Sequence, residues 1–257
     1  MALQIDLTGR LVLVTGGGRG VGRGITEQFL EAGADVIICG RTEPEQPPQR
    51  GGRSAHFLRA DVRESEEVDA LFDQIAGEYG RLDVLINNAG GSPSAEAATA
   101  SVRFAAAIVM LNLQSALTCS QRANELMQQQ EDGGCIVNIG SVSGLRASPG
   151  TAAYGAAKAG LINLTASLAV EWAPRVRVNC VSAGLIVTEQ AHQHYGDEIG
   201  QARIAATVPL GRLGTPQDVG VACVFLASPL ASYISGANLV VHGGGERPAF
   251  LAARKEK

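Results

Sequence analysis

The chain has 257 residues, of which 46% are hydrophobic and 18% charged, a composition that excludes global disorder and suits one large α/β domain. A net charge of −4 gives no electrostatic reason to expect nucleic acid or an anionic membrane as a partner. Five scattered cysteines, an odd number, argue against a disulfide framework or a zinc site, so no metal is expected. The N-terminus lacks a signal-peptide pattern, and no stretch approaches the roughly 20 apolar residues that span a bilayer. We therefore expect a cytoplasmic protein with no membrane association.

Short apolar runs rich in β-branched residues alternate along the chain with longer segments of helical spacing. Runs that are apolar throughout are typical of strands buried on both faces of a parallel sheet. The expected strands are 11–16, 35–40, 56–62, 82–90, 135–141, 176–184 and 238–244, and the expected helices are 20–32, 64–79, 101–129, 151–173 and 216–228. This alternation predicts a single α/β domain over 1–257, a Rossmann-type doubly wound parallel sheet of about seven strands flanked by helices. The Pro- and Gln-rich segment 43–53 is expected to be an exposed loop.

The first expected strand leads directly into TGGGRGVG, residues 15–22, and then into a helix. Glycines let the backbone turn tightly and approach a pyrophosphate, whose charge the helix N-terminus receives. A glycine-rich turn alone is a weak signal, because any tight corner between a strand and a helix favours glycine. Its place after the first strand favours a dinucleotide site made by Gly16, Gly18, Arg19, Gly20, Val21 and Gly22.

The second expected strand ends in CGRT, which places Gly40 and Arg41 where NAD-binding folds commonly carry an acidic residue. A carboxylate there would repel a 2′-phosphate, whereas the planar guanidinium of arginine suits one. Arg19 and Arg41 therefore favour NADP(H) over NAD(H). The alternative is that both are solvated loop residues.

Two further strand ends, ADV at 60–62 and NNAG at 87–90, are expected at the same crevice. Ligands of an open parallel sheet lie outside the carboxyl ends of its strands. Each motif also has a structural interpretation, since Asp61 could cap a helix and NNAG could simply end a strand.

Tyr154 and Lys158 stand one helical turn apart in TAAYGAAKAG, a segment otherwise made of small residues. A nearby ammonium favours the phenolate, so we expect Lys158 to lower the pKa of Tyr154 and make it a usable acid or base. Ser141, at the end of the fifth expected strand, can face that tyrosine. Asn112 lies inside an expected helix, where an amide has little propensity reason to be. Individually, each of these residues could be structural.

Together these motifs resemble the short-chain dehydrogenase/reductase family, in its TGxxxGxG and Tyr-x-x-x-Lys form, over nearly the whole chain. The resemblance implies that Tyr154 is the acid/base and that Ser141 orients the substrate oxygen. It also implies that Lys158 binds the nicotinamide ribose and that Asn112 holds a water on a proton path. The implied cofactor is NADP(H), contacted in addition by Asp61, Val62, Asn88, Ala89, Gly90, Ile186 and Thr188.

One position departs from the family pattern. Ala183 precedes Gly184 where the family usually has Pro-Gly, which frees φ and puts the rigidity of that turn in doubt.

Substrate choice is expected to lie in the polar substrate-loop region 189–210, which could form a lid over the cleft. His192, His194 and Tyr195 could meet substrate there or be exposed loop residues. The resemblance further implies a homo-oligomer, a tetramer or a dimer, formed through 101–129, 151–173 and the C-terminal segment.

The expected function is an NADP(H)-dependent oxidoreductase that interconverts a small-molecule carbonyl compound and a secondary alcohol by hydride transfer. One alternative is a 3-oxoacyl-thioester reductase acting on acyl-carrier-protein or CoA substrates. A second is a non-catalytic NADP(H)-binding sensor, which is disfavoured because it gives no reason to keep Ser141, Tyr154 and Lys158 together.

Overall fold

A parallel sheet of seven strands runs through the middle of the protein, in the order β5-β2-β1-β6-β7-β8-β9. The computed structural model describes residues 5–248 and 250. The strands of the sheet are β1 Leu11–Thr15, β2 Asp35–Gly40, β5 His56–Arg59, β6 Val84–Asn87, β7 Gly134–Ser141, β8 Val176–Ala183 and β9 Asn238–Val241. β1 and β6 are buried throughout because helices cover both faces, which explains why they are apolar up to their last residues, Thr15 and Asn87. The predicted fold class is confirmed.

Several strands end earlier than the apolar runs suggest. β5 stops at Arg59 and β6 at Asn87, so that the ADV and NNAG motifs lie just beyond the ladder. The strand order reverses between β1 and β6, which sends consecutive crossovers to opposite sides and opens a crevice at the carboxyl ends. The two motifs therefore lie where such folds bind ligands.

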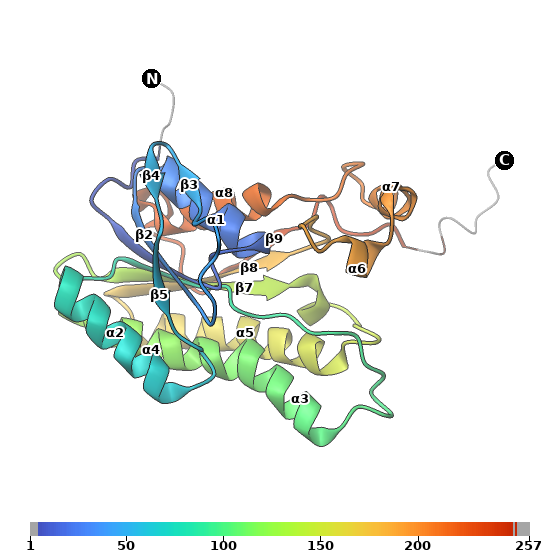
Figure 1. The fold of residues 1–257 in the computed structure, drawn as a ribbon, viewed down its shortest axis with the longest axis horizontal. Helices are drawn as coiled ribbons and strands as arrows, with labels where there is room; N and C mark the ends of the chain where they lie inside the picture. Colours follow the sequence, from blue (N-terminus) through green and yellow to red (C-terminus); the bar gives the residue numbers. More distant parts are fainter. Residues whose placement is uncertain (1–4, 249, 251–257) are drawn as a thin grey trace.

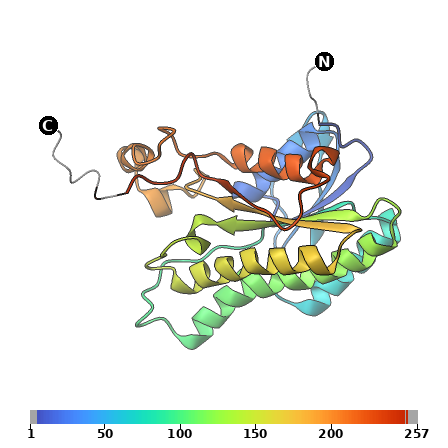
Figure 2. The same cartoon turned by 180° about the vertical axis from the view of Figure 1, so that it is seen from behind.

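Two layers of helices enclose the sheet (Figures 1 and 2). α1 (Gly20–Glu31) and α8 (Pro216–Ala227) cover one face, over an apolar core that includes Phe29 and Ile25. The other layer contains α2 (Ser65–Tyr79), α4 (Ser115–Gln129) and α5 (Ala152–Glu171), over a second core. The remaining helical segments are α3 Val102–Val109, η1 Met110–Gln114, η2 Val142–Gly144, α6 His192–Tyr195, α7 Glu198–Ala205 and η3 Pro229–Ala231.

The segment expected as one helix over 101–129 contains a π-helical turn, η1, between α3 and α4. There the backbone N–H of Ser115 donates to the carbonyl oxygen of Met110, five residues earlier, instead of four. Asn112 lies inside this turn. π-turns widen a helix and are frequent at functional sites, and sequence periodicity of 3.6 gave no sign of one.

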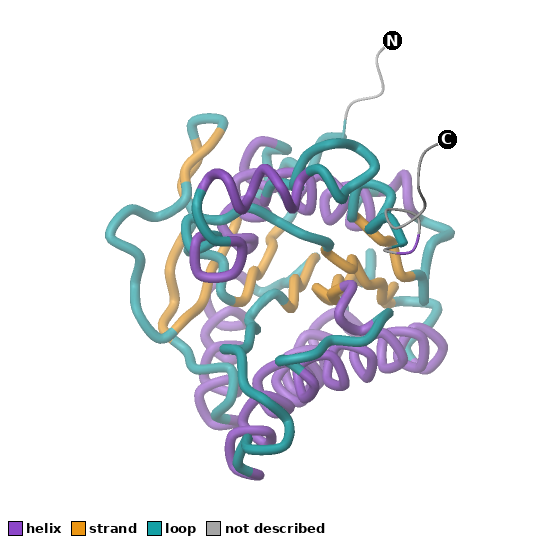
Figure 3. Tube along the Cα trace, turned by 90° about the vertical axis from the view of Figure 1, so that its right-hand side faces the viewer, coloured by secondary structure: helices purple, strands orange, loops and turns teal. Residues whose placement is uncertain are grey.

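By length and composition, Val102–Gln129 could cross a membrane, since an 18-residue window reaches a mean hydropathy of 1.4 with 28% of it buried. The expectation that no stretch is this apolar is therefore wrong. In the fold, this helical stretch lies beside α5 and its α4 part packs on β6 and β7, in one helical layer of the sheet. Figure 3 shows that layer end-on, below the strands.

The connection from β2 to β5 carries a two-residue antiparallel hairpin, β3 (Gln49–Arg50) and β4 (Arg53–Ser54), in place of the expected plain loop. An ion pair between Arg50 Nε and Glu31 Oε2, at 3.0 Å, joins the hairpin to α1. The polar region 189–210 also differs from a plain connection, because α6 and α7 lie within it.

Candidate active site

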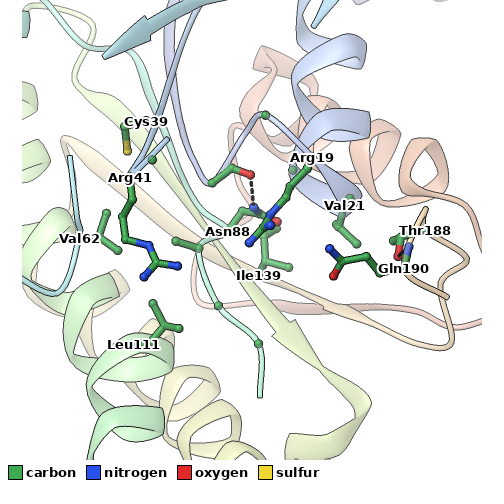
Figure 4. A pocket seen from close by; sticks show the side chains of 18 of the residues that line it. Arg19, Val21, Cys39, Arg41, Val62, Asn88, Leu111, Ile139, Thr188 and Gln190 are labelled. Carbon is green, nitrogen blue, oxygen red and sulfur yellow. Dashed lines mark hydrogen bonds between the residues drawn. The ribbon is translucent and has the colours of Figure 1, made fainter. Parts of the chain in front are cut away.

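A cleft of about 740 Å³ opens at the carboxyl ends of the strands, against the reversal point between β1 and β6. Its wall is formed by the glycine-rich turn, the ends of β2, β7 and β8, the first turns of α5 and the segment after β8 (Figure 4). All predicted site residues except Asn112 line it, namely Gly16, Gly18, Arg19, Gly20, Val21, Gly22, Arg41, Asp61, Val62, Asn88, Ala89, Gly90, Ser141, Tyr154, Lys158, Ile186 and Thr188.

The glycine-rich turn brings backbone close to backbone. Gly16 and Gly20 have φ of 65° and 53°, in the left-handed region that favours glycine. A Cβ on Gly22 would lie 2.2 Å from the carbonyl oxygen of Gly16, so no other residue fits. Arg19, the N-cap of α1, makes no side-chain capping hydrogen bond. The first backbone N–H groups of α1 are therefore left for other hydrogen-bond acceptors.

The NNAG motif shapes this turn from the side of β6. The Asn88 side-chain nitrogen Nδ2 donates to the carbonyl oxygens of Thr15 and Gly16, at 2.9 and 3.2 Å. The Thr15 hydroxyl in return accepts the backbone N–H groups of Asn88 and Ala89, both at 3.0 Å. Asn88 and Thr15 therefore fix the shape of the cleft, and the positioning role of the Thr15 hydroxyl was not foreseen.

Two arginines point into one end of the cleft. Figure 4 shows the guanidinium groups of Arg19, from the turn after β1, and Arg41, from the end of β2, directed into the cavity. Neither side chain makes a hydrogen bond or ion pair with any part of the chain that the structure describes. Both positive groups are therefore available to an anion.

Asp61, at the same end, is held by a neighbour that sequence reasoning did not single out. Arg63 Nε donates to Asp61 Oδ1 at 2.9 Å, and Arg63 Nη2 to Oδ2 at 2.5 Å. This hydrogen bonding to Arg63 lowers the pKa of Asp61, so the carboxylate is ionised at neutral pH. The bidentate pair fixes the Asp61 carboxylate at the cleft, whose wall both residues line.

Tyr154, Lys158 and Ser141 form the wall at the other end. The Lys158 side chain is 3% exposed, and its Nζ donates to the carbonyl oxygen of Ile139 at 2.7 Å. The same nitrogen lies 5.7 Å from the centroid of the Tyr154 ring. The Ser141 hydroxyl is hydrogen-bonded to Tyr154, and its oxygen also accepts the backbone N–H of Ser143 at 3.1 Å. The helix and the strand end thus bring together the three residues that the motifs predicted.

Burial is the main cause of the shifted pKa values of Lys158 and Tyr154 in this wall. It lowers the pKa of Lys158 from its ordinary 10.5 to about 8. It raises the pKa of Tyr154, and the hydrogen bond from Ser141 only partly opposes that effect. The expected lowering of the Tyr154 pKa by Lys158 is therefore wrong for the chain alone. The ammonium lies over the ring and is bonded to Ile139, so it does not offset the desolvation of the phenol.

Asn112 lies behind the wall, not on it. Its Oδ1 accepts the backbone N–H of Gly91 at 2.8 Å, and its Nδ2 donates to the carbonyl oxygens of Gly91 and Ile108, both at 2.9 Å. A Cβ on Gly90 would lie 2.7 Å from Asn112 Oδ1 and 3.3 Å from Lys158 Nζ. Asn112 therefore fastens the Gly90–Gly91 backbone next to Lys158.

The turn after β8 is tied down despite having Ala183 in place of proline. Ala183 pairs with Ser141 of β7 and Val241 of β9 in the ladder. Beyond it, Gly184 N–H donates to Val241 O, and Val187 N–H donates to Gly214 O, both at 2.9 Å. These backbone bonds hold Ile186 and Thr188 at the cleft, and the expected loosening is not seen.

The substrate-loop region contributes three residues to the cleft: Glu189, Gln190 and Tyr195. Burial raises the pKa of Tyr195. His192 is exposed and does not line the cleft, and the side chain of His194 lies outside the described residues. Sequence reasoning named Tyr195 but missed Glu189 and Gln190, although both directly follow Thr188.

Comparison with known proteins places these features in a family. Residues 16–246 match a family model described as enoyl-(acyl carrier protein) reductase. An uncharacterized oxidoreductase of Mycobacterium tuberculosis, MT0954, is 37% identical over 243 residues, covering 93% of this chain and 92% of the relative. The 3-oxoacyl-[acyl-carrier-protein] reductase FabG of Chlamydia muridarum is 36% identical over 246 residues, covering 93% of this chain and 98% of the relative.

Solved structures agree with the sequence matches. The Pseudomonas aeruginosa RhlG/NADP active-site complex superposes with a TM-score of 0.84 at 29% identity, covering 95% of this chain and 99% of that one. The family match spans the glycine-rich turn, the Ser141–Tyr154–Lys158 wall and the turn after β8. The chain therefore belongs to the short-chain dehydrogenase/reductase family and is an oxidoreductase acting on CH–OH groups.

Proposed function

We propose that this protein is an NADP(H)-dependent oxidoreductase that interconverts a carbonyl compound and a secondary alcohol by hydride transfer. The observation that carries the proposal is one continuous cleft with a different chemistry at each end. Ser141, Tyr154 and Lys158 line the cleft beside β7, and the glycine-rich turn with Arg19 and Arg41 lines it beside β1 and β2, on the other side of β6. A bound nicotinamide nucleotide would supply or accept the hydride.

The residues at the cleft fit such a nucleotide. The close backbone approach at Gly16 and Gly22 makes a concave cradle, and the α1 N-terminus favours a diphosphate. Arg19 and Arg41 would hold a 2′-phosphate, with Asp61 and Val62 at the adenine. The remaining predicted contacts run along the cleft from Asn88, Ala89 and Gly90 to Lys158, Ile186 and Thr188.

Each residue of the catalytic wall has a distinct role in the proposal. The Tyr154 hydroxyl gives its proton to the carbonyl oxygen as the carbonyl carbon is reduced, and takes it back from the alcohol in the reverse reaction. The oxygen of Ser141 already accepts from Ser143 N–H, so its own proton can be donated to the substrate oxygen. Lys158 replaces the proton lost by Tyr154. Asn112 keeps the Gly90–Gly91 backbone against Lys158. Through a water, Asn112 also connects Lys158 to a proton path.

A narrower candidate function is reduction of a 3-oxoacyl thioester. It is supported by the likeness to the Chlamydia muridarum reductase. A second cavity, of about 450 Å³ with Val142, Leu145 and Leu185 on its wall, adjoins the cleft at Gly184 and could receive an apolar acyl chain. The sensor alternative ranks below both, because it gives the buried Lys158 no purpose.

The test is NADPH oxidation with a panel of ketones, aldehydes, keto sugars and 3-oxoacyl thioesters. We expect at least one class to be reduced, and Tyr154→Phe to lower kcat by on the order of 10²–10⁴ while NADPH still binds. Tyr233→Phe, at a fully exposed tyrosine, is the matched control. Equal rates for wild type and Tyr154→Phe would remove the proposed role of Tyr154.

The nucleotide is tested separately, by comparing the dissociation constants of NADPH and NADH. Arg41→Ala is expected to raise the dissociation constant of NADPH by roughly tenfold or more, because one hydrogen bond to a charged group is lost. The dissociation constant of NADH should be nearly unchanged. Arg103→Ala, on α3 outside the cleft, is the control. An unchanged preference would count against Arg41 as the phosphate partner.

A further inference from the structure

A carboxylate from the far end of the chain occupies the N-terminus of α1. Glu189 Oε1 accepts the backbone N–H of Gly20 at 2.8 Å, a contact between residues 169 positions apart. Gly20 opens the 12-residue helix α1, and its N-cap, Arg19, supplies no side-chain cap. Glu189 therefore does for α1 what a capping side chain ordinarily does.

This contact falls where the proposed function places the cofactor's diphosphate. A carboxylate and a phosphate are attracted to a helix N-terminus for the same reason, and one N–H cannot satisfy both. Two negative groups that compete for the same N–H would also repel each other. Among the side chains that the structure describes, no basic residue pairs with the Glu189 carboxylate, and its hydrogen bond is to the helix end.

Glu189 also begins the substrate-loop region. It follows Thr188, whose methyl group would lie 3.8 Å from a Cβ on Gly20, and it precedes Gln190 and α6. Gln190 and Tyr195, in the same segment, line the cleft. A change in the position of Glu189 is thus transmitted directly to residues that could face substrate.

We propose that the Glu189 contact with Gly20 restrains the substrate-loop region at the N-terminus of α1, and that a dinucleotide diphosphate competes with Glu189 for that helix end. Displacement of Glu189 by the diphosphate would then free the start of residues 189–210 from α1. The inference rests on the proposed function only in requiring a dinucleotide, and it holds for NADP(H) and NAD(H) alike. If Glu189 were only a helix cap, its removal would destabilise α1 without strengthening nucleotide binding.

Equilibrium binding gives the first readout. Glu189→Gln and Glu189→Ala are expected to lower the dissociation constant of NADPH by about two- to fivefold at low salt, the size of one charge effect at a helix end. The intrinsic fluorescence of NADPH measures this binding. The gain should shrink at high salt and should be equal for NADH. Glu45→Gln is the control, since Glu45 is an exposed carboxylate outside the cleft. Binding of the Glu189 variants that is equal to or weaker than wild type would overturn the inference.

Hydrogen exchange of the free protein gives a second readout that needs no nucleotide. Backbone amides of residues 189–206 should exchange several-fold faster in Glu189→Ala than in wild type, while α8 stays unchanged. Equal exchange rates of residues 189–206 in the variant and in wild type would show that the Glu189–Gly20 contact does not restrain this segment. If wild type bound neither NADPH nor NADH, the proposed function would fail, whereas nucleotide binding without a gain in the variants rejects the Glu189 contact alone.

Discussion

At the scale of single residues, Lys158 is placed for function at the expense of stability. Its ammonium is buried and has one hydrogen bond, to Ile139. Burial without a carboxylate partner is unfavourable for a charged group, which is why its pKa falls to about 8. We expect Lys158→Met to raise the free energy of unfolding of the free protein by about 1–3 kcal/mol near pH 7 and to abolish activity. Urea unfolding and NADPH oxidation measure the two effects.

The stability difference should depend on pH. Below about pH 8, Lys158 is charged in both the folded and the unfolded chain, and the full desolvation cost is present. Between about 8 and its ordinary 10.5, the folded chain has released the proton that the unfolded chain still holds, so wild-type stability rises with pH. The advantage of Lys158→Met should therefore narrow from about pH 7 to about pH 10. A constant difference would show that the cost is not electrostatic.

Motifs located most residues of the cleft because the residues of each motif are close in sequence. Tyr154 and Lys158 are one turn apart, and Gly16 to Gly22 form one turn. What the motifs could not give were contacts between distant segments: the bond from Gly20 to Glu189, and the fastening of Gly91 by Asn112. The pKa of Tyr154 was missed for the same reason, since it depends on burial by the whole fold.

At the scale of elements, the small residues of α5 explain how a helix and a strand end share one site. A Cβ on Gly155 would lie 2.9 Å from the carbonyl oxygen of Ser143, in the turn η2 that follows Ser141. Glycine therefore lets η2 lie directly against α5, which keeps Ser141 at hydrogen-bonding distance from Tyr154. The run of small residues around the tyrosine thus has a packing purpose that is also a catalytic one.

This packing can be tested with one methyl group. Gly155→Ala is expected to push η2 away from α5 and to lower kcat about tenfold or more, because small misplacements of catalytic groups are costly. The NADPH dissociation constant should not change. Gly160→Ala on the same helix is the control, since its Cβ would meet only the flexible Leu113 side chain, at 3.1 Å. Equal kcat values for the two variants would contradict the argument.

Element types followed from the sequence more reliably than element details. Alternating apolar runs predicted the strands because burial on both faces demands that composition. The π-turn at Met110–Gln114 has no comparable signature, and the hairpin Gln49–Arg50/Arg53–Ser54 is only two residues deep on each side. Short elements of this kind depend on neighbours such as Glu31 of α1, which the local sequence does not reveal.

At the scale of the whole molecule, the sheet order decides which segments meet. Because the order reverses between β1 and β6, residues as far apart as Gly16 and Tyr195 line one cleft at one end of the sheet. The other surfaces of the domain are then available for association. Several large apolar side chains of α3, η1 and α5 are exposed, and α3 lies beside α5 in the outer helical layer. Val102 on α3 is 87% exposed, and Val170 on α5 is 79% exposed.

We expect these exposed side chains to be covered by a second copy of the chain, because large apolar side chains left exposed on neighbouring helices are typical of interfaces between subunits. The purified protein should therefore have at least twice the monomer mass by light scattering. A double substitution in the same outer helical stretch, Val109→Glu with Met110→Glu, should lower that mass while leaving the far-ultraviolet circular dichroism unchanged. Ile199→Glu, at an exposed apolar residue of α7, is the control. A wild type that is monomeric at micromolar concentration would contradict this prediction, and an oligomer untouched by the double substitution would place the interface on another face.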